Sequence, residues 1–104
     1  MRLRRDPFRD VIARQLDLFV EDEADLLEEC REKFRSYENA PREDAEEAYG
    51  DFVDAVETAT EALADMRDRF ARTLGEDAAE TYEGAFNRSV RKRWAELGLE
   101  IENR

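Results

Sequence analysis

The sequence predicts an all-α protein, folded as an antiparallel three-helix bundle with coiled-coil-like packing. Two long helices are expected at about 7–38 and 41–74, and a shorter third helix at about 76–97. Apolar residues recur every three or four positions in all three segments, which is the pattern of a helix with one buried face. Proline or glycine separates the segments, and charged residues, 43% of the chain, fill the positions between the apolar ones.

The first predicted helix begins cleanly, because Asp6 can cap it and Pro7 suits the first helical position. Its apolar residues form two rows with a spacing of seven, and Cys30 falls in one of them, where a free cysteine acts as a small apolar side chain. The rows are Ile12, Phe19 and Leu26, and Leu16, Glu23, Cys30 and Tyr37. Glu23 interrupts the second row, and Pro41 ends the helix.

The second predicted helix has the most regular pattern, because no charged residue interrupts either of its rows. The rows are Ala45, Phe52, Ala59 and Met66, and Tyr49, Val56, Leu63 and Phe70. Gly50 lies inside this helix, and we expect a close approach to Cys30 there. Gly75 supplies a stop signal at the carboxyl end.

The third predicted helix begins with acidic residues, which suit the positive end of the helix dipole. Its apolar residues are Ala79, Tyr82, Phe86, Val90, Trp94 and Leu97. A chain of 104 residues forms one domain by the usual size range, so we expect residues 1–104 to be a single helical domain. Residues 1–6 are then a basic amino-terminal arm and residues 98–104 a carboxyl-terminal tail.

Charge and register together predict one ion pair. A turn centred near residue 40 and a second at Gly75 would place Glu23 of the first helix level with Arg93 of the third. Since Glu23 interrupts an apolar row, we expect a buried Glu23–Arg93 ion pair that fixes the register. The basic residues at 88–93 would lie beside the acidic middle parts of the two long helices.

The composition argues against catalysis and against resident cofactors. The chain has no histidine, one cysteine and four isolated glycines, so the commonest general base, the commonest metal ligand and a glycine-rich phosphate loop are all missing. We expect no enzymatic activity, cofactor or metal. There is no long apolar run or signal peptide, which favours a cytoplasmic protein without a membrane span. The net charge of −11 and fifteen arginines against two lysines resemble a halophile composition.

The predicted third helix is too short to cover the far end of the helical hairpin. The residues expected to form an interaction surface there are Phe34, Tyr37, Ala45, Tyr49, Leu99 and Ile101. The tail folding over this end, a second copy of the chain, or a different protein could cover the surface. The leading hypothesis is therefore a non-catalytic scaffold or adaptor that acts through protein–protein contacts, possibly as a homodimer.

Two other functions stay open. One is an acidic inhibitor that mimics nucleic acid and occupies a basic partner, because residues 15–65 carry eighteen acids and four bases. The other is a ligand or ion site inside the bundle around Glu23. Nucleic acid itself is not an expected partner, since the net charge repels a polyanion.

Overall fold

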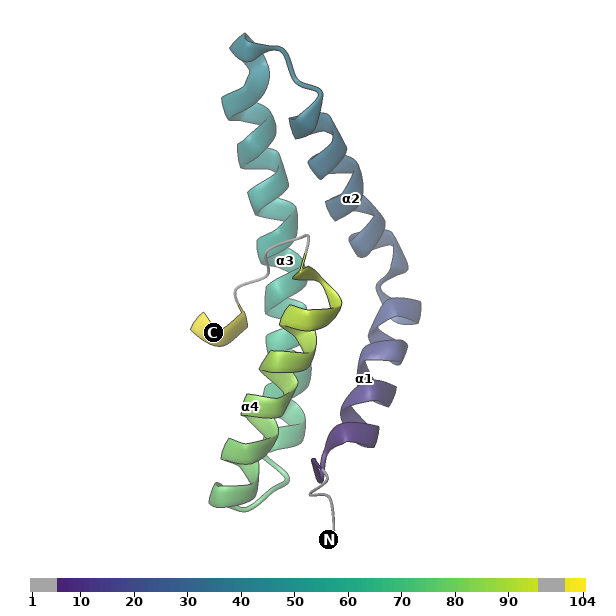
Figure 1. Ribbon diagram of the computed structural model, residues 1–104, viewed down its shortest axis with the longest axis vertical. Coiled ribbons are helices and arrows are strands. Elements are labelled where there is room, and N and C mark those ends of the chain that lie inside the picture. Colours follow the sequence, from purple (N-terminus) through teal and green to yellow (C-terminus); the bar gives the residue numbers. More distant parts are fainter. Residues whose placement is uncertain (1–5, 96–100) are drawn as a thin grey trace, which may run out of the picture.

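The computed structural model describes residues 6–95 and 101–104 and is all-helical within them (Figure 1). Four α-helices pack together: α1 (Arg9–Asp22), α2 (Ala24–Glu38), α3 (Ala45–Ala71) and α4 (Glu76–Arg93). Two short 3₁₀ helices complete the fold, η1 (Arg42–Asp44) before α3 and η3 (Ile101–Asn103) near the carboxyl end. The described part of the chain contains no strand.

The predicted first helix is two helices, so the count of three is wrong. The helix breaks at Glu23, whose backbone has φ −116° and ψ 34°. Neither proline nor glycine lies at the break. The break coincides with the one charged residue in the apolar rows. The helices on its two sides have different packing partners, since α1 packs against α4 and α2 packs along α3.

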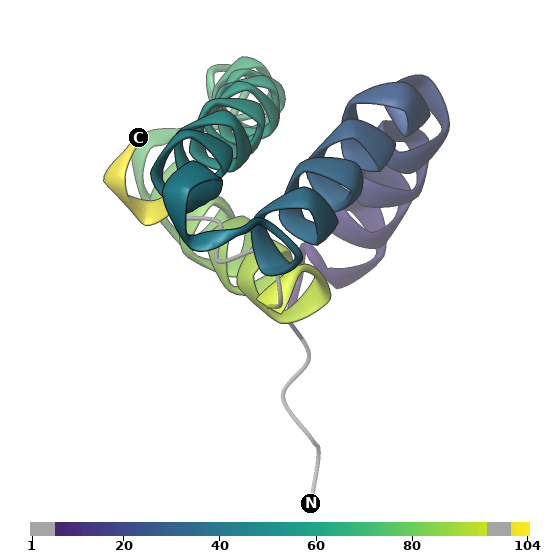
Figure 2. The ribbon, with the colours of Figure 1, turned by 90° about the horizontal axis from the view of Figure 1, so that it is seen from above.

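The helices surround one core (Figure 2). At its lower end the rings of Phe8, Phe70 and Tyr82 meet, with centroid distances of 5.4 Å between Phe8 and Tyr82 and 4.8 Å between Phe70 and Tyr82. Midway along the bundle Phe19 meets Trp94 edge to face at 6.0 Å. These contacts join α1, α3 and α4. The upper part of the α2–α3 hairpin extends beyond α4 in Figure 1.

The register between α2 and α3 differs from the expected one. Phe34 packs against Phe52 and Tyr37 against Tyr49, each pair with 5.2 Å between ring centroids. These pairs place the centre of the turn near residue 43 rather than 40. The cause is the connection, since Asn39 to Asp44 form a loop and a 3₁₀ turn and α3 begins only at Ala45. If α3 had started at Pro41, each residue of α2 would face a residue of α3 about one and a half turns away from the one that it faces in the structure.

The same shift corrects the expectation for Gly50. Its position is exposed, and an added Cβ would meet no atom within 4 Å. Cys30 is buried as predicted, but it lies against Ala55, whose carbonyl oxygen is 3.4 Å from the thiol sulfur. Gly75 has an extended backbone and is the N-cap of α4. Helix α4 ends at Arg93, four residues before the predicted end.

The carboxyl-terminal segment packs against the middle of the bundle. Ile101 is fully buried, and η3 contacts both α3 and α4. The side chain of Arg67, itself buried, donates hydrogen bonds to the carbonyl oxygens of Ile101 (3.3 Å) and Arg104 (2.7 Å). It also binds Asn87 Oδ1 at 3.0 Å and Asp68 Oδ1 at 2.8 Å. Arg67 therefore anchors the segment to α3.

Candidate functional site

The outer end of the α2–α3 hairpin presents aromatic side chains to solvent. Tyr37 is 36% exposed and Tyr49 is 50% exposed, and their rings lie against each other across the two helices. Phe34, Phe52 and Ala45 are half-buried. We call these five residues the hairpin tip. The structure thus brings together four residues of the predicted interaction surface and adds Phe52 to them.

The other two residues of the predicted surface do not belong to the tip. Ile101 is buried beside Arg67, in the last turns of α3 and far from the tip, so this part of the tail does not fold over the hairpin. The prediction for Ile101 is wrong, because a buried arginine offers hydrogen bonds to the tail carbonyls at that level and the sequence pattern did not reveal it. Leu99 lies outside the described residues.

The charge around the tip has one dominant sign. Residues 37–54 include seven carboxylates and one arginine, and all eight side chains belong to exposed residues. The acids are Glu38, Glu43, Asp44, Glu46, Glu47, Asp51 and Asp54, and the base is Arg42. Two exposed tyrosines within a strongly negative surface are suited to arginine and lysine side chains, which bind both carboxylates and the faces of aromatic rings.

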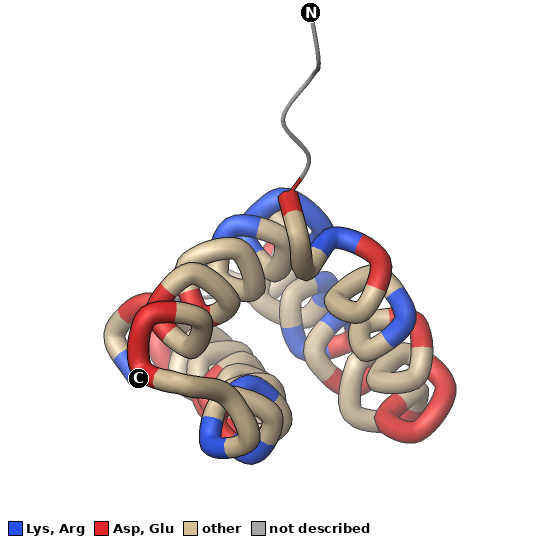
Figure 3. Tube along the Cα trace, turned by 90° about the horizontal axis from the view of Figure 1, so that it is seen from below, with Lys and Arg blue, Asp and Glu red and all other residues tan. Residues whose placement is uncertain are grey.

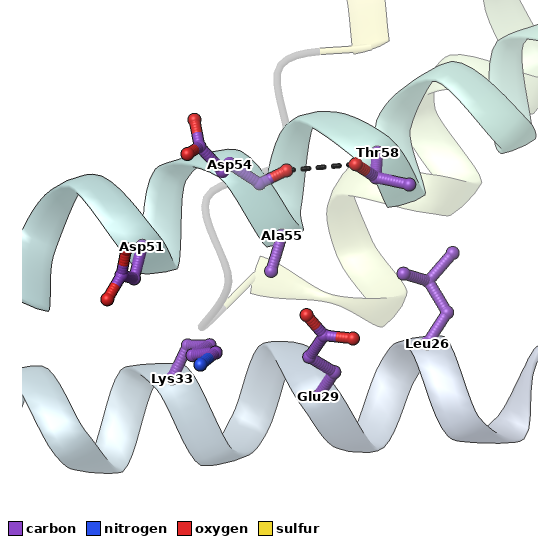
Figure 4. Close-up of a pocket in the computed structure, with 7 residues that line it drawn as sticks. All are labelled: Leu26, Glu29, Lys33, Asp51, Asp54, Ala55 and Thr58. Carbon is purple, nitrogen blue, oxygen red and sulfur yellow. Dashed lines mark hydrogen bonds between the residues drawn. The ribbon is translucent and has the colours of Figure 1, made fainter.

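A shallow pocket of about 330 Å³ opens between α2 and α3 on the same hairpin (Figure 4). Leu26 and Ala55 give it an apolar part, while Glu29, Asp51 and Asp54 supply three carboxylates against the single cation Lys33. Thr58 completes the lining and donates a hydrogen bond to the Asp54 carbonyl oxygen at 3.0 Å. The pocket is therefore a second site with excess negative charge, and its residues lie close to the tip residues in the sequence.

The predicted Glu23–Arg93 ion pair is replaced by another. Arg93 Nη2 lies 2.8 Å from Asp17 Oδ1, and the two side chains are 36% and 67% exposed, so the pair is not buried. The guanidinium also lies 5.4 Å from the centre of the Trp94 ring. The shifted α2–α3 turn does not account for this change, since on its own it would set Glu23 level with residue 88. Helix α1 does not continue the line of α2 along α3 but, beyond the break at Glu23, packs on α4, where Asp17 reaches Arg93. Glu23 is half-buried at the break between α1 and α2.

Burial changes the protonation of two groups in the core. It raises the pKa of the Cys30 thiol above its ordinary value, so the thiol stays protonated at neutral pH and is a poor nucleophile. Burial also raises the pKa of Tyr82 to about 12, although the hydrogen bond from its hydroxyl to Gln15 Oε1 at 2.8 Å acts in the opposite direction. Neither group is prepared for nucleophilic or acid–base chemistry near pH 7.

The described residues contain no group of three or more potential ligands placed to hold a metal ion. No described helix is long and apolar enough to cross a membrane. The chain matches no protein-family model, and neither a curated protein nor a solved structure resembles it closely enough to count as a match.

Proposed function

We propose that this protein is a non-catalytic scaffold or adaptor, and that its hairpin tip binds a cationic segment of another protein. One observation carries the proposal: Tyr37 and Tyr49 are exposed as a pair, and residues 34–54 around them carry seven exposed carboxylates against two bases, Arg42 and Arg35, the latter paired with Glu28. Tyrosine is enriched at protein interfaces because its ring is apolar and its hydroxyl remains polar. The carboxylates define the partner as basic.

A second copy of the chain is a poorer occupant of the tip. Two tips that meet face to face would bring two strongly negative surfaces together, and like charges at an interface are costly. A partner with arginine or lysine side chains removes this repulsion. It also gains charge-assisted hydrogen bonds to Asp51 or to Glu29, which lie in the adjacent pocket.

One feature of α3 favours the nucleic-acid mimic as a second candidate. Five exposed carboxylates lie within an arc of about 80° on one face of this helix, at 100° per residue. They are Glu47, Asp51, Asp54, Glu61 and Asp65. None of them forms an ion pair with a described residue. A mimic needs a one-sided row of this kind.

The density of charge makes the mimic the weaker candidate. The five carboxylates extend over about 27 Å of helix axis, or roughly one charge per 7 Å. Double-stranded DNA carries one charge per about 1.7 Å. The negative charge per unit length along α3 is therefore only a fraction of that to which a DNA-binding groove is matched. The tip requires no such match, because it combines charge with exposed aromatic area.

Binding of a model peptide separates the two candidates. The peptide is an amphipathic helix of arginine and leucine, and its affinity is measured by calorimetry at 50 and 300 mM salt. For the tip, we expect Tyr37→Ala/Tyr49→Ala to weaken binding by more than tenfold, since buried interface tyrosines commonly contribute over 2 kcal/mol. Leu18→Ala is the matched control, because Leu18 is also 50% exposed but lies on α1.

Each candidate fails on a different result. If the tyrosine variants bind the peptide like the wild type while Asp54→Asn/Glu61→Gln/Asp65→Asn does not, the charged row of α3 is the site and the tip proposal is wrong. Light scattering of the free protein tests whether a second copy of the chain occupies the tip. A dimer that disappears in the Tyr49→Ala variant would show that the tip binds a second copy.

A further inference from the structure

A basic groove lies between the start of α1 and the end of α4. Its volume is about 760 Å³, within the range of small-molecule sites. Four cationic side chains line it (Arg9, Arg88, Arg91 and Lys92), together with Ser89, Ala85 and one carboxylate, Asp6. A smaller hollow of about 250 Å³ shares Arg9, Ser89 and Lys92 and adds Arg93. The two hollows share these three lining residues along the α1–α4 contact.

The groove concentrates positive charge on a protein whose net charge is −11. In Figure 3 the blue segments of α4 and of the start of α1 lie next to each other, and residues from both line the groove. The structure thus departs from the sequence-based expectation that residues 88–93 are neutralised by the acidic middle parts of the long helices. Only part of the block is neutralised there.

The cations of the groove fall into two groups. Arg91 forms an ion pair with Glu102, and Arg93 forms one with Asp17. Arg9, Arg88 and Lys92 form no ion pair with a carboxylate in residues 6–95 or 101–104. Three cations therefore face a common depression whose lining includes a single carboxylate, Asp6, so positive charge is in excess there and the cations repel one another.

Helix electrostatics explain only some of these residues. Arg91, Lys92 and Arg93 lie in the last turn of α4, where the helix dipole favours cations. Arg9 is the first residue of α1, where the dipole disfavours a cation. Phe8, the N-cap, contributes no side-chain hydrogen bond at this end. Asp6 Oδ1 accepts a hydrogen bond from the Phe8 backbone N–H at 2.9 Å and so offsets part of the positive potential of this helix end. Arg9 still places its charge beside Arg88 and Lys92, and a bound anion would lower the repulsion among these three cations.

We propose that the groove binds a compact anion with two or more phosphate groups. Guanidinium groups bind phosphate oxygens in pairs, and a lysine adds a point charge. The size of the ligand determines whether the groove favours a compact anion or a nucleic acid. Charges more than about 8–10 Å away are screened at physiological salt, so a small anion in the groove responds mainly to the lining cations. A long polyanion would continue past the groove onto the acidic faces of the hairpin and be repelled.

The test uses inorganic triphosphate as the probe and calorimetry at 50 mM salt. Arg88→Gln/Lys92→Gln removes two exposed cations and should weaken binding at least tenfold, since each charge-assisted hydrogen bond is worth roughly a factor of ten. Arg42→Gln/Arg72→Gln is the matched control, because it changes the net charge equally at exposed positions outside the groove. We expect the control to bind triphosphate within twofold of the wild type.

Circular dichroism and urea unfolding establish that both variants fold. Three results would overturn the inference: no binding of triphosphate by the wild type, equal weakening in the groove and control variants, or a single-stranded oligonucleotide that binds more tightly than triphosphate. The last result would make the groove part of a nucleic-acid interface. Failure of this inference leaves the hairpin tip unaffected, because the tip shares no residue with the groove.

Discussion

The role of Arg67 as the anchor of the carboxyl-terminal segment can be tested by a double-mutant cycle. Replacing Arg67 with alanine removes two hydrogen bonds to the carbonyls of Ile101 and Arg104, each from a charged donor and worth about 1.5–3 kcal/mol. The segment then detaches and exposes Ile101, whose burial is worth about 2–3 kcal/mol. The released residues regain conformational entropy of about 1–2 kcal/mol each, which offsets much of this loss.

The net expectation for Arg67→Ala is a loss of about 2–4 kcal/mol in the free energy of unfolding. Ile101→Ala should cost a similar amount, about 2–4 kcal/mol, because it leaves a cavity under a fully buried side chain. The double variant should be hardly less stable than Arg67→Ala alone, since Ile101 has already left the core. The coupling energy is then close to the whole cost of Ile101→Ala, about 2–4 kcal/mol.

Urea unfolding followed by circular dichroism measures all four stabilities. Arg69→Ala is the control, because it removes the same charge from an exposed position on the same helix and should change stability by less than about 0.5 kcal/mol. Additive losses in the double variant would refute the anchoring role. They would mean that Ile101 stays buried without Arg67 and that the arginine stabilises α3 and α4 by a separate route.

Three further predictions concern single positions. Gly50→Ala should stabilise the protein by about 0.5–1 kcal/mol in thermal unfolding, because Gly50 lies in a helix with open space around it; a loss would show that the glycine conformation matters there. Native Cys30 should react with a thiol reagent only as fast as the protein opens, since burial shields the thiol and raises its pKa; labelling at the rate of the unfolded chain would contradict its position. The pKa of Tyr82 is about 12 in the folded state against about 10 when unfolded, so its contribution to stability is complete below pH 10 and is lost as pH rises through 12. The stability advantage over Tyr82→Phe should shrink by about 2 kcal/mol across that window, and a constant difference would refute the shift.

The sequence predicted those parts of the fold that depend on local pattern. The apolar rows place Leu63, Tyr82, Phe86 and Trp94 in the core, and all four are buried. The pattern did not give the length of the connection between α2 and α3. A few residues spent in a 3₁₀ turn alter no hydrophobic period, yet they move the contacts between α2 and α3. The break at Glu23 was also missing from the pattern, and it lets α1 pack on α4 in a register that brings Asp17 rather than Glu23 to Arg93.

In the candidate sites too, features that depend on the local sequence pattern were predicted, and features that depend on distant parts of the chain were not. Tyr37 and Tyr49 were identified because they continue apolar rows past the reach of the third helix, and both are exposed. The burial of Arg67 was missed, since an arginine near a helix end is usually solvated and two of its four hydrogen-bond acceptors here are backbone oxygens more than thirty residues away. Such carbonyls carry no sequence signal.

The break at Glu23 divides the molecule into parts that differ in how many neighbours support them. Below it, α1, α4, η3 and the second half of α3 support one another; above it, among the described elements, α2 packs chiefly along α3 (Figure 1). A two-helix element with fewer buried contacts opens at a lower free energy than a three-helix one. Amide hydrogens of the upper hairpin should therefore exchange through local opening while those of the lower part wait for global unfolding. A partner at the tip would bind the less stable part of the protein and so raise its protection selectively.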